Sequence, residues 1–324
     1  MTDLAELRSG TKADLARALA RMEAAADDPA VVDLLDAAFA DARGHVVGVT
    51  GPPGVGKSTL VSALIARLRG RGETVGVVAV DPSSKRRGGA LLGDRTRFVL
   101  DPGDRGIFVR SMAARDELGG LAALTMPAVV LMRALFDRVV VETVGVGQSE
   151  TAIGDVADTV VFAVQPASGD SLQFMKAGIV EIPDVAVVTK GDLGGHADRA
   201  ARELQGALEL ATDGAGGRIA IHVVSAAEDR GIDALLASID AHRCALGRPR
   251  ALLERHAAQA GLWLQRRVHD QFGRHGLARA RALGRLETEP RRPFRAYAEL
   301  AAVLAPNDRS TQSGTHGSTV AAPA

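Results

Sequence analysis

The sequence predicts an α/β fold in which helices cover both faces of a mostly parallel β-sheet. Two observations lead to this fold class: short, β-branched apolar runs alternate with helical patterns between residues 45 and 242, and the motifs that carry chemistry follow the apolar runs. Strands that alternate with helices pair in parallel, so the segments that follow them meet at one edge of the sheet. We therefore expect ligands at the carboxyl ends of the strands.

Composition indicates a globular main domain with helical additions. The 324 residues include 39 basic and 39 acidic side chains, and this balance predicts no general attraction to nucleic acid. The apolar runs are short and interrupted, so we expect no membrane-spanning helix and no signal peptide, and we interpret the chain as cytoplasmic. The single cysteine, Cys244, excludes an intramolecular disulfide and a cysteine-rich metal site.

Helical patterns precede and follow the predicted sheet. The N-terminal part is rich in alanine, with apolar residues at helical spacing, and Leu253, Leu264 and Val268 mark an apolar face near the other end. The last residues are rich in Ser, Thr, Gly and Ala, a composition typical of disorder. We divide the chain into an N-terminal helical segment, a main domain, a C-terminal helical arm and a disordered tail, at residues 1–44, 45–245, 246–306 and 307–324, respectively.

The stretch from Val46 to Leu60 reads VVGVTGPPGVGKSTL and joins a predicted strand, a glycine-rich turn and a helical pattern. This is the P-loop arrangement, in which glycines allow backbone N–H groups to surround a phosphate chain at a helix N-terminus. Lys57 is expected to neutralise the outer phosphates, and the Ser58 hydroxyl to reach Mg²⁺. The candidate phosphate-binding residues are Gly51, Gly54, Val55, Gly56, Lys57, Ser58 and Thr59.

Acidic residues that follow two further predicted strands are candidate partners of Mg²⁺. The strand over residues 74–80 ends at Asp81, and the long polar loop after it contains Asp94. Glu142 ends another strand, and Gly145 follows three residues later. A phosphate-hydrolysing fold places a second acidic Mg²⁺ partner here, together with the loop that senses the terminal phosphate.

The sequence TKGD, at residues 189–192, follows a further strand and predicts recognition of guanine. In this geometry the Asp192 carboxylate accepts hydrogen bonds from N1 and N2 of the base, and the stem of Lys190 covers the ring. Adenine lacks these donors, so the pattern favours GTP and GDP over adenine nucleotides. Ser225 and Ala226 follow the last predicted strand, where a backbone N–H that contacts guanine is expected.

Seven motifs together resemble the MeaB/ArgK family of G proteins, in the SIMIBI-type branch of P-loop NTPases. They are GPPGVGKST, DPSS, GGALLGDRTR, ETVGVGQSE, SGDSLQFMKAG, TKGD and Ser-Ala, and they cover roughly residues 45–240. The resemblance implies a metallochaperone-like GTPase that gates cofactor loading of an adenosylcobalamin-dependent acyl-CoA mutase, such as methylmalonyl-CoA mutase, and protects this enzyme. It also implies a homodimer formed through the C-terminal arm.

The resemblance further implies roles for individual residues. Lys176 lies in the segment that matches the family's third switch, over residues 166–178, and is expected to move toward the nucleotide when the mutase binds. Lys57 would stabilise phosphate oxygens, with Asp94 as the candidate that orders the attacking water, so that hydrolysis is slow alone and stimulated by the partner. The metal-linked and γ-phosphate-sensing positions would be Asp81, Asp94, Glu142 and Gly145.

Several positions depart from the family pattern. The usual NKAD is TKGD here, and Thr189 lacks the amide that braces the P-loop, so we expect somewhat weaker nucleotide affinity with guanine preference preserved by Asp192. The segment SMAARDELGG also differs from the family pattern and is a surface that could meet a partner. The partner could therefore be a relative of methylmalonyl-CoA mutase that acts on another short branched acyl-CoA.

Two other functions share part of this pattern. A P-loop small-molecule kinase should have an acceptor-binding lid with clustered arginines, and the nearest cluster is Lys85, Arg86 and Arg87. The TKGD and Ser-Ala motifs argue against this alternative. A metallocentre-insertion GTPase would need a Cys or His metal cluster, whereas the eight histidines are scattered along the chain.

Overall fold

The structure, a computed structural model, describes residues 3–82, 98–101, 103–114, 124–143, 152–166, 183–211, 219–247, 249–286 and 290–305. These residues contain a seven-stranded sheet in the order β3-β2-β4-β1-β5-β6-β7, and every neighbouring pair is parallel. The predicted α/β fold with a parallel sheet is therefore confirmed. The strands are β1 (His45–Thr50), β2 (Val75–Pro82), β3 (Ile107–Ala114), β4 (Arg138–Glu142), β5 (Thr159–Val164), β6 (Val185–Val188) and β7 (Ala220–Val223).

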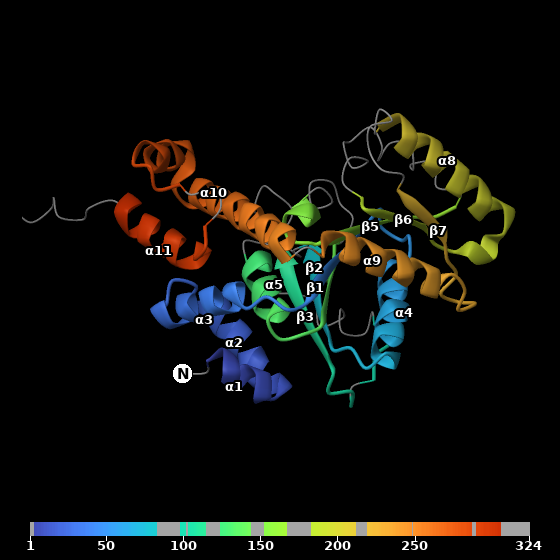
Figure 1. Ribbon diagram of the computed structural model, residues 1–324, viewed down its shortest axis with the longest axis horizontal. Helices are drawn as coiled ribbons and strands as arrows, with labels where there is room; N and C mark the ends of the chain where they lie inside the picture. Colours follow the sequence, from blue (N-terminus) through green and yellow to red (C-terminus); the bar gives the residue numbers. More distant parts are fainter. Residues whose placement is uncertain are drawn as a thin grey trace, which may run out of the picture.

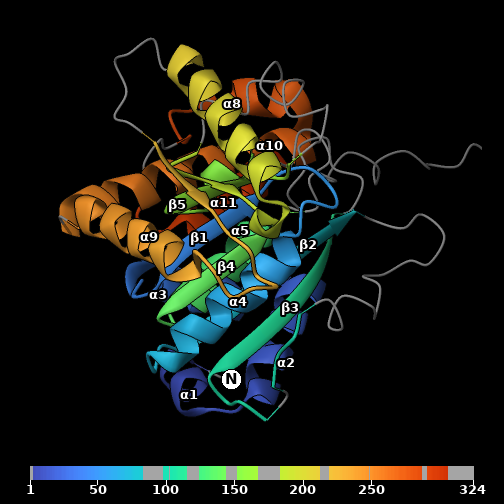
Figure 2. The ribbon, with the colours of Figure 1, turned by 90° about the vertical axis from the view of Figure 1, so that its right-hand side faces the viewer.

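Helices surround this sheet, with α8 at one end of the molecule and α10 and α11 at the other (Figure 1). The strands run through the middle, and α1 and α2 lie at the end away from α8 (Figure 2). The helices are α1 (Leu4–Ser9), α2 (Lys12–Ala24), α3 (Pro29–Ala40), α4 (Lys57–Gly70), α5 (Thr125–Arg133), α8 (Gly195–Ala211), α9 (Ile232–Leu246), α10 (Pro249–Ala282) and α11 (Pro293–Leu304), with short 3₁₀ turns η2 (Ile153–Asp155) and η4 (Gly191–Leu193).

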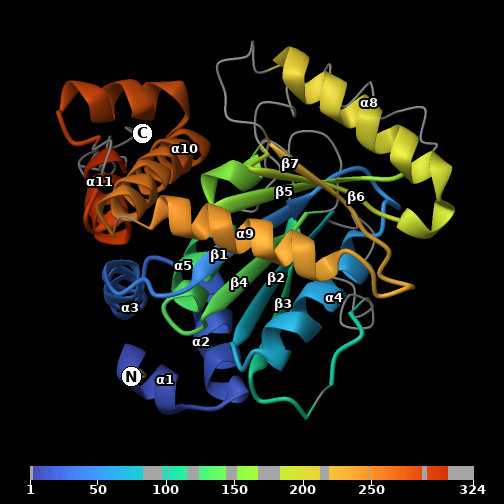
Figure 3. The same ribbon diagram turned by 45° about the vertical axis from the view of Figure 1, so that its right-hand side comes forward.

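Alternating residues of the central strand, β1, pack into apolar clusters on opposite faces of the sheet. Val47 and Val49 pack in a cluster with the apolar faces of α4 and α9, which lie side by side over one face of the sheet (Figure 3). Val46 packs on the opposite face, with α5 and the N-terminal helices. This two-residue alternation explains why Val46, Val47 and Val49 are all apolar and β-branched, as expected for a sheet that is buried on both faces.

The strand order places β1 between β4 and β5, with β2 and β3 on one side and β6 and β7 on the other. The chain therefore leaves the end of β1 where the order of the sheet changes direction. In open α/β sheets, the crevice at such a point binds ligands. The P-loop follows β1 and lies at this position.

The N-terminal and C-terminal helices are packed against each other. Asp36 of α3 accepts hydrogen bonds from the backbone N–H groups of Phe294 and Arg295, each 3.1 Å long, and thereby satisfies two donors in the first turn of α11. His256 of α10 lies 2.8 Å from the carboxylate of Asp158, which immediately precedes β5. α3 thus contacts α11, and α10 contacts the residue that precedes β5.

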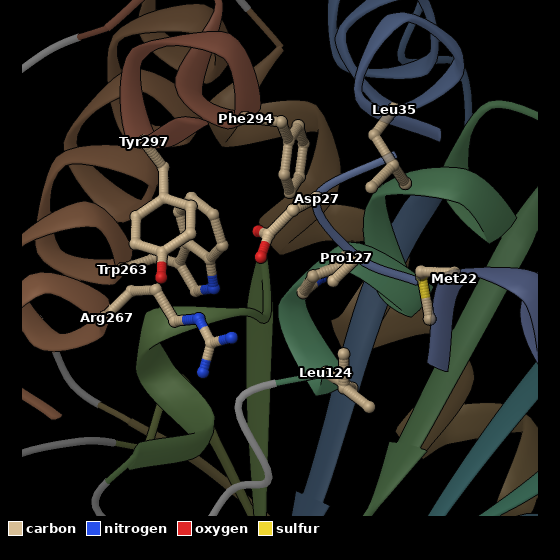
Figure 4. A pocket seen from close by; sticks show the side chains of 10 residues that line it. Met22, Asp27, Leu35, Leu124, Pro127, Trp263, Arg267, Phe294 and Tyr297 are labelled. Atoms are coloured by element: carbon tan, nitrogen blue, oxygen red, sulfur yellow. The ribbon is translucent and has the colours of Figure 1, made fainter. Parts of the chain in front are cut away.

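A group of aromatic rings fills the joint between these helices. The ring centroid of Trp263 lies 4.9 Å from that of Phe294 and 5.7 Å from that of Tyr297. Figure 4 shows these rings around a small pocket, with Arg267 and Asp27 at its wall. The residues that line the pocket come from α2, α3, α5, α10, α11 and neighbouring turns, so the pocket belongs to the joint and not to the P-loop.

Some sequence expectations need correction. β3 runs to Ala114, because β2 pairs with it over its whole length. Leu264 and Val268 are buried in the cluster between α10 and α11, whereas Leu253 is 59% exposed and does not share their buried face. α10 is also interrupted at Gly273, where φ is +65° and ψ is −170°.

The boundaries of the four segments remain predictions. In the described part of the chain, no helix combines the length and apolar character needed to cross a membrane.

The buried imidazole of His45 predicts a pH-dependent stability. His45 is 3% exposed, and its Nε2 lies 2.9 Å from the Thr159 hydroxyl. Burial lowers the pKa of His45 from 6.5 to about 4, so the folded protein keeps this ring neutral. The resulting stability is complete above pH 6.5 and is lost as the pH falls toward 4.

Replacement of this ring by a neutral amide should remove part of that pH dependence. Between pH 7 and pH 5, the free energy of unfolding of the parent should fall by about 2 kcal/mol more than that of His45→Gln. Urea denaturation at a series of pH values measures both curves. If the two curves ran parallel, His45 would not be the group responsible.

Candidate functional site

The turn between β1 and α4 depends on glycines in left-handed or otherwise unusual backbone conformations. Gly51 has a φ of +143°, and a Cβ there would lie 2.0 Å from the carbonyl oxygen of Ala163 in β5. Gly54 and Gly56 have φ values of +76° and +93°, which L side chains rarely adopt. α4 then starts at Lys57 without a side-chain cap, so no side chain competes with an anion for its first N–H groups.

The Lys57 side chain places a buried positive charge inside this turn. It is 6% exposed, and its Nζ donates to the carbonyl oxygens of Gly51 and Pro52 over 2.7 and 2.9 Å. A buried ammonium group is costly unless hydrogen bonds or an opposite charge compensate for the lost water. The turn is therefore suited to an anionic ligand such as a phosphate chain.

Ser58 and Glu142 meet at the carboxyl end of β4. The Ser58 hydroxyl donates to Oε1 of Glu142 over 2.7 Å, and Glu142 is 2% exposed. In β2, Ala79 is the register partner of Glu142, so the backbone of Asp81 lies two residues further toward the same edge. Mg²⁺ prefers oxygen ligands and usually combines one or two side chains with phosphate oxygens and water. The hydroxyl and carboxylate of this pair fit that requirement.

The residues predicted to read the base follow β6, in and just before η4. Ser225, which is fully buried, donates its hydroxyl hydrogen to Oδ1 of Asp192 over 2.7 Å. This hydrogen bond, followed by a backbone N–H, lowers the pKa of the Asp192 carboxyl, in keeping with its role as a hydrogen-bond acceptor. Lys190 has a φ of +53° and donates to Oε1 of Gln165, directly after β5.

The structure separates the expected roles of Ser225 and Ala226. The backbone N–H of Ser225 donates to the carbonyl oxygen of Arg230 over 3.0 Å, so it is used within its own loop. The N–H of Ala226 forms no hydrogen bond with another residue that the structure describes. Ala226 is therefore the member of the pair whose N–H can meet a ligand, while Ser225 orients Asp192.

Thr189 lacks the amide of the usual family pattern, but its hydroxyl contacts the P-loop. The expected weaker nucleotide affinity stays a prediction. The buried hydroxyl of Thr189 lies 2.6 Å from the carbonyl oxygen of Val55 and 3.0 Å from that of Val164. A hydroxyl has one hydrogen, and the shorter contact leads to Val55. The short side chain reaches the loop because β6 ends close to it, a proximity that the TKGD pattern alone does not reveal.

Other predicted site residues cannot be compared with this geometry. Asp94, Gly145 and Lys176 lie outside the residues that the structure describes, as does the basic cluster at residues 85–87. Only the backbone of Asp81 is described. Thr59 is exposed in the first turn of α4.

A sequence profile for the family described as Methylmalonyl Co-A mutase-associated GTPase MeaB matches residues 15–280. The chain belongs to the MeaB family. The match covers the P-loop, the TKGD loop and most of α10, and it confirms the expected family, whose description is that of a GTPase.

Curated relatives are consistent with this membership. A putative GTPase of Pyrococcus abyssi is 46% identical over 215 residues, which is 65% of this chain and 66% of that protein. A probable GTPase of Mycobacterium tuberculosis is 40% identical over 244 residues, 73% of each chain. A mouse protein named methylmalonic aciduria type A homolog, mitochondrial, is 44% identical over 167 residues, 51% of this chain and 40% of the relative. The chain thus spans just under two thirds of the Pyrococcus protein.

A solved structure extends the similarity to nearly the whole MeaB-family chain. The crystal structure of the LAO/AO transport system kinase matches with a TM-score of 0.61 and 27% sequence identity, and the match covers 92% of this chain and 96% of that one. The arrangement of the sheet and its flanking helices is therefore shared with that protein.

Removal of the Thr189 hydroxyl tests the brace in this MeaB-family site. Thr189→Val keeps the size of the side chain, and we expect GDP affinity to fall about fivefold to thirtyfold because the Val55 carbonyl loses its donor. Thr189→Ser keeps the hydroxyl and should bind GDP within about twofold of the parent. Isothermal titration calorimetry measures all three affinities. Equal affinity of the valine variant and the parent would contradict the brace.

Proposed function

We propose that this chain is a GTP-binding and GTP-hydrolysing chaperone that gates cofactor loading of an adenosylcobalamin-dependent acyl-CoA mutase and protects that enzyme. The observation that carries the nucleotide part is the hydrogen bond from Thr189 to Val55. It ties the TKGD loop to the P-loop, so that one nucleotide can contact both loops. Membership of the MeaB family supports the same function.

In this proposal the P-loop binds the phosphates and Asp192 reads the base. Ser58 and Glu142 would hold Mg²⁺, with Asp81 and Asp94 as further carboxylates of that site. When bound, Mg²⁺ neutralises charge on the β- and γ-phosphate oxygens. The protein contributes a preorganised Lys57 charge and helix N-terminus, which favour the charge that develops during phosphate transfer.

Hydrolysis would depend mainly on positioning. We assign the ordering of the attacking water to Asp94 and the sensing of the γ-phosphate to the segment that begins at Gly145. Lys176 would complete the site when the mutase binds, so the chain alone would turn GTP over slowly. Lys57 acts throughout by holding positive charge against the phosphate oxygens.

The mutase partner is proposed from the relatives. The family description names an association with methylmalonyl-CoA mutase, and the name of the mouse relative refers to methylmalonic aciduria. Methylmalonyl-CoA mutase or a relative of it is therefore the proposed client. A homodimer formed through the C-terminal arm and a cytoplasmic location belong to the same proposal.

A small-molecule kinase is the second candidate, because the solved structure with similar architecture is named as a transport system kinase. The fate of the γ-phosphate distinguishes the two functions. Hydrolysis releases inorganic phosphate in the same amount as GDP, whereas a kinase would transfer it to an acceptor. Transfer to an amino acid or a coenzyme A ester above the rate of hydrolysis would favour the kinase.

Capture from a native lysate tests the proposed partner. The tagged chain should retain a cobalamin-dependent mutase to different extents with a non-hydrolysable GTP analogue and with GDP. Lys57→Ala should lose this difference, because the phosphates lose their buried counter-charge. Lys12→Ala is the matched control, since Lys12 is exposed on α2 and bonds only the Asp104 carbonyl among the described residues; it should behave as the parent does.

Mass spectrometry identifies the proteins that are retained in each nucleotide state. Recovery of an acyl-CoA mutase with the parent, and loss of the nucleotide effect with Lys57→Ala, would agree with the proposal. Recovery of no cobalamin-dependent mutase in either state would contradict the chaperone role.

A further inference from the structure

The loop from Ser225 to Gly231 forms a hydrogen bond with the backbone of Gly191, next to Asp192, the proposed base-reading residue. We propose that Arg230 is a positioning residue for guanine recognition, which holds Asp192 in place through the carbonyl group of Gly191. This inference rests on the proposed function, because it assumes that Asp192 reads the base. Arg230 itself need not touch the nucleotide.

Gly191 lies between Lys190 and Asp192 and is tied to the loop on both sides. Its N–H donates to the carbonyl oxygen of Val224 over 2.8 Å, and its carbonyl oxygen accepts from Nη2 of Arg230 over 2.9 Å. A Cβ at position 191 would lie 3.0 to 3.1 Å from atoms of Val223 and Val224. The neighbouring loop thus contacts both backbone groups of the residue before Asp192, and the Gly191 carbonyl oxygen also accepts from the N–H of Gly194 over 3.2 Å.

The loop that carries Arg230 is itself well held. Ser225 and Arg230 exchange two backbone hydrogen bonds, of 3.0 and 2.9 Å. Gly231 has a φ of +81°, and a Cβ there would lie 2.4 Å from the Val223 carbonyl oxygen. The backbone from which the Arg230 side chain extends therefore has little freedom.

A second arginine fixes this loop to the P-loop helix. Arg67 of α4 pairs with Asp229 over 2.6 Å and with Asp233, in the first turn of α9, over 3.0 Å. Asp229 has a φ of +52°, so the loop follows an unusual path at the point where Arg67 meets it. These two ion pairs connect α4, which follows the phosphate loop, with the loop that contacts Asp192.

The guanidinium of Arg230 is shared between two acceptors. Nη1 lies 2.7 Å from Oε2 of Glu228, while Nη2 bonds the Gly191 carbonyl. The planar fork of arginine allows both bonds at once, and a lysine ammonium cannot reproduce this geometry. The Arg230 side chain is 58% exposed, so its effect on nucleotide binding should be moderate.

The placement of Asp192 matters because guanine offers two donors to one carboxylate. Ser225 holds Oδ1 of Asp192 from one side, and the Arg230 contact with Gly191 fixes the backbone from which Asp192 extends. Hypoxanthine has the N1 donor of guanine but lacks the N2 amino group. The preference for GDP over IDP therefore reports how well the carboxylate is placed, and all other contacts of the two nucleotides are the same.

The test measures dissociation constants of GDP and IDP for the full chain and expresses them as a ratio. Both constants come from one preparation, so a loss of folded protein does not change the ratio. We expect the parent to prefer GDP by at least about tenfold, and Arg230→Ala to reduce this preference about threefold to tenfold. Arg199→Ala removes another exposed arginine, paired with Glu203 on α8, and should keep the ratio of the parent.

The double variant Arg230→Ala/Asp192→Asn distinguishes the role of Arg230 from that of Asp192. Asp192→Asn alone should abolish most of the preference, and Arg230→Ala should then have no further effect, because both act through the same carboxylate. An unchanged ratio in Asp192→Asn would overturn the proposed base site. A reduced ratio in Asp192→Asn with no change in Arg230→Ala would overturn only the role of Arg230. An equal effect of Arg230→Ala in both backgrounds would also overturn it.

Discussion

The close approach of Gly51 to the carbonyl group of Ala163 is the constraint on which the site depends. A Cβ at position 51 would lie 2.0 Å from that oxygen, so only glycine allows the chain to leave β1 directly beside β5. The turn that follows brings its N–H groups and Lys57 to the carboxyl ends of β4 and β5, the two strands that flank β1. Without this approach, the phosphate loop would lie away from the strand ends that carry the remaining residues.

Each neighbouring strand then adds one part of the site. β4 ends in Glu142, which contacts Ser58 across the first turn of α4. β6 is followed by Thr189, whose hydroxyl holds the P-loop at Val55. The loop after β7 supplies Ser225, which holds Asp192. Parallel strands make this convergence possible, because all of their carboxyl ends lie at one edge of the sheet.

Much of this arrangement could be predicted from the sequence, because strands and phosphate loops have strong local signals. A strand that ends at Glu142 was predicted, and β4 ends there, since its three valines are followed directly by this acidic residue. The pairing of Lys57 with a glycine-rich turn follows from the motif itself. Asp192 was predicted from its spacing to Lys190, and Ser225 from its position after a strand.

The remaining features depend on distances between segments that are far apart in the chain. The sequence shows that Thr189 lacks the bracing amide of the family pattern, but only the packing of β6 against β5 shows that its hydroxyl reaches Val55. The exposure of Leu253 likewise depends on how α10 meets the main domain, because helical periodicity identifies a shared face without showing what covers it. Arg230 had no motif of its own, and its role appears only from its contact with Gly191.

The most direct test of the central constraint is the GDP affinity of Gly51→Ala compared with Gly70→Ala, measured by titration calorimetry. Gly70 ends α4, and a Cβ there would meet no atom within 4 Å, so this control should bind GDP as the parent does. Gly51→Ala should lose at least about a hundredfold in GDP affinity, because its Cβ forces the phosphate loop away from β5. If Gly51→Ala bound GDP as tightly as the parent, the close approach of Gly51 to Ala163 would not be what positions the phosphate loop.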